Sequence, residues 1–141
     1  MEIEKYLKQI GSLEKLELLQ NSELENIVSD VVSKDDLVQF KLEDLFQNQN
    51  LNAVLLSKIE QTVNLIFIKE ENINVCFANN NEVRPEYKQS FRIIDLLDYM
   101  YAFAHSSEYQ KLQKIIISLE VKVFWKLVKI GAYLRNENAS L

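Results

Sequence analysis

The chain has 141 residues, of which 48% are hydrophobic and 26% charged, which is enough apolar material for one compact core. Its formal net charge is −5, so the chain as a whole has no general attraction for phosphate. The sequence has no secretory signal pattern, no apolar run of about 18 residues and no second cysteine beside Cys76. We therefore predict a cytoplasmic protein with no membrane partner and no internal disulfide.

Glycine and proline are scarce, and this scarcity indicates a helix-rich chain. There are 2 glycines and 1 proline, and these residue types supply most turns with unusual dihedral angles. We predict a mainly α (α+β) fold, with an acidic helical arm over residues 1–47 and a helical domain over residues 48–141 that contains one small β-hairpin around residues 63–78. Charge is uneven, because residues 1–82 hold 7 basic and 15 acidic side chains (net −8), whereas residues 83–141 hold 9 and 6 (net +3).

Residues 2–20 are expected to form the first helix. Four apolar side chains recur at steps of three or four residues and would lie along one side of it: Ile3, Tyr6, Ile10 and Leu13. This side can pack within the chain, which we favour, or against a partner helix. Gly11 weakens the middle of the helix by up to about 1 kcal/mol relative to alanine, and it can mark a break.

A second helix is predicted to begin near residue 22. Asn21 or Ser22 can cap it, and Glu25 stands three residues after Ser22, as in a capping box. Its apolar face would consist of Leu24, Ile27, Val28, Val31 and Val32.

Residues 34–47 admit two interpretations. Leu37, Leu42 and Leu45 fit the apolar face of a helix, whereas Val38, Phe40 and Leu42 alternate with polar residues as in a strand. We favour the helix, followed by a polar linker at residues 47–50.

The next segments predict a helix, a hairpin and a loop. Asn50 or Asn52 can cap a helix that ends near Gln61 and buries Leu51, Val54, Leu55 and Ile59. Residues 63–68 are β-branched and aromatic, and residues 73–78 alternate in polarity, which is typical of a β-hairpin. Residues 78–88 are rich in asparagine and contain Pro85, so we expect a surface loop there.

Residues 90–109 are predicted to form an amphipathic core helix. One face would carry the apolar residues Ile93, Ile94, Leu97, Met100, Tyr101 and Ala104. Asp95, Tyr99 and Ala102 would point the other way. Helical structure is expected to continue over residues 108–119. The run at residues 115–123, which overlaps the end of this range, is ambiguous between helix and strand.

Residues 123–136 are predicted to form the last helix. Its buried face would consist of Phe124, Leu127, Val128, Gly131 and Leu134. Gly131 would allow the close approach of a neighbouring element. Three lysines and a tyrosine would line the opposite side: Lys122, Lys126, Lys129 and Tyr133.

Asp95, Asp98 and His105 share one polar edge of the central helix, with Tyr101 between them. Such a group could bind a metal or exchange protons only with further ligands from elsewhere. We favour a simpler interpretation, in which Asp95 and His105 complement the helix dipole and the tyrosine hydroxyls are hydrogen-bonded at the edge of the core. With 1 histidine and 1 cysteine in the chain, no His/Cys metal cluster can form.

Two sets of polar residues could contact DNA. The first is the lysine stripe of the last helix, which could bind phosphates: Lys122, Lys126 and Lys129. The second lies on the predicted loop, where Asn suits adenine and Arg suits guanine: Asn80, Arg84 and Lys88. A solvated helix face and a plain polar loop are the alternatives, and we favour them for each set taken alone.

Several catalytic motifs are missing from the sequence. The glycines stand at positions 11 and 131 alone, so there is no glycine-rich loop for a nucleotide or for S-adenosylmethionine. A single proline excludes the Pro-Pro tetrad of amino-methylating DNA methyltransferases, and no nucleophile elbow or HExxH motif occurs. We therefore predict no cofactor, no metal and no enzymatic activity of the chain by itself.

Two blocks of the sequence resemble a known family. Residues 90–109, SFRIIDLLDYMYAFAHSSEY, are similar to F-x-P-I-D-I-L-D-Y-I-Y-A-x-L-H-S-P-x-Y-R, and residues 124–135, FWKLVKIGAYLR, to F-W-K-L-V-x-L-G-x-x-L-R. Such blocks lie in the C-terminal specificity region of type ISP restriction-modification enzymes and related adenine-specific DNA methyltransferases. The resemblance covers roughly residues 48–136. The matching residues include Phe91, Asp95, Asp98, Tyr99, Tyr101, His105, Tyr109, Trp125 and Gly131.

The resemblance implies a target-recognition domain that helps to position duplex DNA for a methyltransferase that flips out adenine. From it we expect a non-catalytic module that recognises duplex DNA or docks on a larger methyltransferase or restriction subunit. The alternative is a small regulatory protein, phage- or defence-associated, that binds a partner protein or self-associates as a homo-oligomer through residues 1–47. Ile93 and Ser107 stand where the family has prolines, and Gln110 where it has an arginine.

Overall fold

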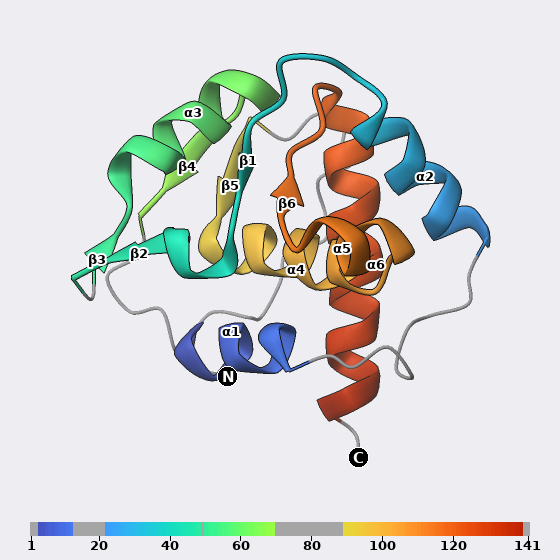
Figure 1. Ribbon diagram of the computed structural model, residues 1–141. Coiled ribbons are helices and arrows are strands. Elements are labelled where there is room, and N and C mark those ends of the chain that lie inside the picture. Colours follow the sequence, from blue (N-terminus) through green and yellow to red (C-terminus); the bar gives the residue numbers. More distant parts are fainter. Residues whose placement is uncertain (1–2, 13–21, 49, 70–88, 140–141) are drawn as a thin grey trace.

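The computed structural model describes residues 3–12, 22–48, 50–69 and 89–139 (Figure 1). Within these ranges the chain forms six α-helices and several short strands, which confirms a mainly α fold with a minor β component. The helices are α1 (Ile3–Gly11), α2 (Ser22–Val32), α3 (Ala53–Val63), α4 (Ile93–Ala104), α5 (Ser107–Leu112) and α6 (Val121–Ala139). Of these helices, none combines the length and the apolar character needed to span a bilayer.

Helix α4 lies at the centre of the molecule, with α6 crossing it and α1 packed along another side (Figure 1). Every residue of α4 except Asp95 is buried. The amphipathic pattern predicted for this helix is therefore wrong, since Tyr99 and Ala102 were expected on its polar side and are fully buried. A helix that is apolar on all sides needs packing partners on all sides, and the surrounding elements supply them.

Helix α6 confirms the last predicted helix and extends it at both ends. Its predicted apolar face is buried, namely Phe124, Leu127, Val128, Gly131 and Leu134. Gly131 packs directly on the backbone of α4, because a Cβ atom there would lie 1.7 Å from the carbonyl oxygen of Asp98. The predicted close approach at this glycine is thus confirmed, and its neighbour is α4.

Side chains from the N-terminal segment enter the same core as those of the C-terminal helices. In α1, Ile3, Tyr6 and Ile10 are buried, so this side packs within the chain as we favoured. The described helix ends at Gly11, while the predicted extension over residues 13–20 lies outside the described residues. In α2, the carboxylate of Glu25 accepts bonds from the backbone nitrogen (2.9 Å) and hydroxyl (2.7 Å) of Ser107, which ties α2 to the start of α5.

The helix predicted over residues 34–47 is wrong. This segment forms β1 (Gln39–Phe40), a 3-10 turn (Leu42–Leu45) and β2 (Phe46–Gln47). The pairing partner decides the outcome: β1 runs antiparallel to β6 (Ile115–Ile116), which buries Phe40 in the core. The strand-like alternation at Phe40 was the correct local signal, and it depended on a segment far along the chain.

The predicted linker at residues 47–50 is instead part of a small antiparallel pair. Strand β2 pairs with β3 (Asn50–Leu51), and Asn48 between them has a left-handed backbone with φ of 51°. Asn52 then caps α3 by accepting a bond from the Leu55 nitrogen at 3.2 Å, which confirms the second of the two proposed caps. Leu55 and Ile59 are buried as predicted, whereas Val54 is exposed.

The first strand of the predicted hairpin is present as β4 (Ile66–Ile68). Its described partner is β5 (Ser90–Arg92), which runs parallel to it. The second strand of the hairpin, residues 73–78, and the loop at residues 78–88 lie outside the described residues, as does Cys76. The hairpin itself therefore stays a prediction.

The single helix predicted over residues 90–109 is wrong at both ends. Residues 90–92 belong to β5, and the helix breaks after Ala104. His105 caps the end of α4, and the hydroxyl of Ser106 caps α5 by accepting a bond from the Tyr109 nitrogen at 3.3 Å. The helical continuation to residue 119 also fails, because Gln113 adopts a left-handed conformation with φ of 55° and the chain enters β6.

Candidate functional site

The residues that match the family blocks lie mainly inside the protein. Those that are buried are Phe91, Asp98, Tyr99, Tyr101, His105, Tyr109, Trp125 and Gly131. Asp95 is half-buried, and its carboxylate accepts a bond from the Arg92 nitrogen at 2.9 Å at the start of α4. This agrees with the favoured interpretation that Asp95 complements the N-terminal end of the helix dipole. In this protein, the resembling blocks mostly make packing contacts.

Asp98 joins three helices in a buried cluster. The hydroxyl of Tyr6 in α1 donates to its Oδ1, and Arg135 in α6 donates from Nε to Oδ1 at 2.9 Å and from Nη2 to Oδ2 at 3.2 Å. The two charged side chains are 3% and 15% exposed. The prediction that Asp98 lies on a polar helix edge is therefore wrong: its polarity is satisfied inside the core by partners on other helices.

Burial shifts the pKa values of all three members of this cluster. It raises the pKa of Asp98, while the bonds from Arg135 and Tyr6 oppose that rise. Burial, and then the charge of Asp98, raises the pKa of the Tyr6 hydroxyl well above its usual range. Burial is the largest single influence on the pKa of Arg135 and would lower it, but the bond to Asp98, the charge of Asp98 and the interactions with Tyr6 together outweigh burial and raise it. An ion pair whose carboxylate is buried and accepts three hydrogen bonds indicates a structural role.

Tyr99 connects α4 to the segment that contains β6. Its hydroxyl donates to the Ile116 carbonyl oxygen at 2.6 Å and accepts a bond from the Ser118 nitrogen at 3.0 Å. Burial raises the pKa of Tyr99 above its ordinary value, although the bond from Ser118 works in the opposite direction. The ring stacks on Phe124 of α6, with 5.1 Å between centroids. Tyr99 thus satisfies two buried backbone groups and leaves no open site.

The second tyrosine and the histidine also have structural contacts. The Tyr101 hydroxyl accepts a bond from Gln9 Nε2 at 3.1 Å, and its ring meets Tyr6 edge to face. The His105 ring lies against Tyr101, with 4.8 Å between centroids. His105 is the C-terminal cap of α4, so its expected place at the negative end of the helix dipole is confirmed. Because its side chain is buried, the expectation that it lies on a polar edge of the helix is wrong.

Asp95 is bonded to Arg92, Asp98 is bonded to Tyr6 and Arg135, and His105 lies against Tyr101. Across the described ranges, no group of three or more His, Cys, Asp or Glu side chains is arranged to hold a metal ion.

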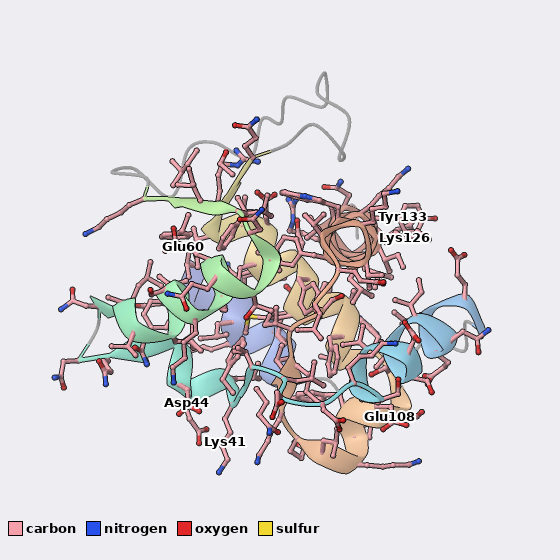
Figure 2. All side chains as sticks on the ribbon, turned by 90° about the horizontal axis from the view of Figure 1, so that it is seen from above. Lys41, Asp44, Glu60, Glu108, Lys126 and Tyr133 are labelled. Atoms are coloured by element: carbon pink, nitrogen blue, oxygen red, sulfur yellow. The ribbon has the colours of Figure 1, made fainter. Side chains whose placement is uncertain are left out.

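The lysine stripe of α6 lies on the surface, as predicted. Lys122, Lys126 and Lys129 are exposed, and Tyr133 is 64% exposed one turn further along. Figure 2 shows Lys126 and Tyr133 on the same outer side of α6, which is seen nearly end-on. None of the ion pairs found among the described residues involves these three lysines. We call the surface formed by Lys122, Lys126 and Lys129 the α6 face; Tyr133 lies next to it.

The other predicted DNA contacts, Asn80, Arg84 and Lys88, lie outside the described residues. They stay predictions.

Sequence reasoning missed Tyr6 and Arg135 as the partners of Asp98. They stand 92 and 37 residues away from it in the chain. Tyr6 appeared as one more apolar residue of the first helix, and Arg135 as the last letter of the second block. The one available signal was an aspartate in the middle of an otherwise apolar helix, since a buried charge needs a partner of opposite charge.

Comparisons of the chain with protein-family models, with curated proteins and with solved structures gave no match.

Proposed function

We propose that this chain is a non-catalytic cytoplasmic recognition module that binds duplex DNA through the α6 face. The observation that carries the proposal is the row of three exposed lysines on α6, whose opposite side is fixed to the core at Gly131. Long flexible lysine side chains on a rigid helix are suited to contact phosphates, which set affinity and register on a duplex. The resemblance to a specificity region favours DNA over other polyanions.

The spacing of the lysines suits a nucleic-acid backbone. Lys122 and Lys129 are seven residues apart, which corresponds to about 10 Å along a helix. Phosphates of one DNA strand recur about every 3.4 Å along the duplex axis. Three lysines on this length of helix can therefore reach about three successive phosphates. The negative charge of the rest of the chain would keep such binding weak and confined to this face.

A salt titration tests the proposal. Binding of a fluorescently labelled duplex would be followed by anisotropy at increasing salt concentrations. Replacing Lys122, Lys126 and Lys129 together by glutamine should weaken binding and reduce the slope of log K against log salt by about 2.7, which is about 0.9 for each lost phosphate contact. Binding that does not depend on salt, or no binding at all, would refute the proposal.

A matched control separates the α6 face from net charge. Lys5 and Lys8 of α1 and Lys58 of α3 are also exposed. Replacing these three by glutamine changes the net charge equally but leaves α6 intact. The control protein should keep the affinity and salt slope of the wild type, whereas equal losses in both triple variants would assign the binding to overall charge.

The alternative function is a regulatory protein that binds a partner or self-associates through residues 1–47, and one observation counts against self-association. The apolar side of α1 is buried within its own chain, so α1 has little apolar surface left for a second copy. Light scattering of the intact chain over a range of concentrations would test self-association, and a mass that stays that of one chain would count against it. The exposed α6 face could also bind a larger methyltransferase or restriction subunit. The affinity of the chain for such a subunit would test this.

A further inference from the structure

Tyr133 is unusual among the aromatic residues of this protein. The other described tyrosines, Tyr6, Tyr99, Tyr101 and Tyr109, are buried, and of the described aromatic side chains Tyr133 alone is exposed. It lies four residues, one helical turn, after Lys129 and therefore continues the line of lysines along α6. An aromatic ring at the end of a basic row is a typical arrangement for stacking a nucleobase next to bound phosphates.

Glu137, one helical turn beyond Tyr133, limits which chemical group of a ligand can bind at this end of α6. Interaction with the Glu137 carboxylate raises the pKa of the Tyr133 hydroxyl. The Tyr133 side chain is largely open to solvent. The negative charge of Glu137 repels a phosphate at this position. An uncharged group would therefore be favoured over Tyr133, while phosphates are favoured over the lysines.

We propose that the α6 face binds duplex DNA that contains an unpaired base, with the backbone on Lys122, Lys126 and Lys129 and the unpaired base stacked on Tyr133. This inference rests on the proposed function and specifies its substrate class. In an intact duplex the bases are stacked inside and cannot reach a side chain that lies along the backbone. An unpaired base can leave the stack, and aromatic side chains bind such bases with little regard to their identity.

The test compares two labelled probes, a fully paired duplex and the same duplex with an unpaired stretch in its middle. The wild-type protein should bind the second probe more tightly, by a factor on the order of 5 to 100 per stacked base. Tyr133→Ala should remove this preference and leave the affinity for the paired duplex unchanged. Tyr133→Phe should keep the preference, because the ring remains and only the hydroxyl is lost.

The outcomes distinguish this inference from the proposed function. Lysine-dependent binding of equal strength to both probes would overturn the role of Tyr133 and leave the proposed function standing. No lysine-dependent binding to either probe would overturn both. Equal weakening of both probes by Tyr133→Ala would also overturn the stacking role, because the ring would then act on the paired duplex too.

Discussion

Replacing Gly131 by alanine tests the contact on which the arrangement of α4 and α6 depends. An added Cβ would lie 1.7 Å from the Asp98 carbonyl oxygen, whereas ordinary contacts begin at 3.4 Å. The nearest atoms all belong to the α4 backbone, so no side chain can rotate away. The two helices must separate by about 1.7 Å, and a gap of half that size already removes a substantial part of the van der Waals attraction between packed atoms.

The expected cost follows from two opposing terms. Overpacking a core costs about 1–3 kcal/mol, and a clash between backbones belongs at the upper end of that range or beyond it. Alanine in a helix gains up to about 1 kcal/mol over glycine. We therefore expect Gly131→Ala to lower the free energy of unfolding by at least about 2 kcal/mol.

Urea denaturation followed by the fluorescence of Trp125 would measure this loss. Trp125 is the single tryptophan of the chain, and it is buried on α6, the helix that carries Gly131. For a domain of this size, a loss of about 2 kcal/mol moves the midpoint down by about 1 M urea. An unchanged or higher midpoint would refute the packing of α6 on α4 described above.

The other glycine of the chain supplies the control. At Gly11 an added Cβ would meet only the end of the flexible Leu42 side chain, at 3.4 Å. Its φ is not positive, so alanine is not strained there. Gly11→Ala should leave stability unchanged or raise it by up to about 1 kcal/mol.

Three further predictions concern buried polar groups. Tyr99→Phe leaves two buried backbone groups without their partner, so it should cost about 3 kcal/mol in urea denaturation, whereas a loss below about 0.5 kcal/mol would contradict the bonding described. Arg135→Ala should cost about 3–5 kcal/mol at neutral pH, and the loss should shrink as the pH falls toward the ordinary Asp pKa of 3.8, because Asp98 without its partner then takes up a proton. A loss that does not change with pH would argue against the ion pair. Tyr6 and Tyr99 have folded pKa values raised above the ordinary 10.0, so the stability each contributes is complete below pH 10 and is lost as the pH rises, by about 1.4 kcal/mol per pH unit for each. Phenolate absorbance and circular dichroism should therefore show these two hydroxyls ionising only as the protein unfolds, and full ionisation of the native protein would refute their burial.

The sequence predicted those elements whose information is local. The 3.6-residue period of α6, with a glycine on its apolar side, was sufficient to predict both the buried face and the close approach at Gly131. The sequence offered Asn50 or Asn52 as the cap of α3 from their side chains and the apolar residues that follow, and the structure shows Asn52. These features depend on neighbours within about two helical turns.

The errors arose where distant segments decide the local structure. Strand β1 has two residues, and it exists because β6 lies beside it. Periodicity could not predict that α4 is buried on all sides, because a polar residue such as Asp98 enters a core only when partners arrive from α1 and α6. The predicted site residues on α4 were placed on a surface for the same reason.

The burial of the family-like residues limits what the resemblance says about function. Asp98, Tyr99 and Tyr101 look chemically rich in the sequence, but each is bonded to a partner inside the protein. Buried and bonded side chains cannot read a base or contact a phosphate, so they constrain the scaffold and not the ligand. Under the proposed function, recognition would depend on exposed residues, and those on α6 include the three lysines and Tyr133. A relative could keep both blocks and still bind a different target, because the exposed positions of α6 can change without disturbing the contact at Gly131.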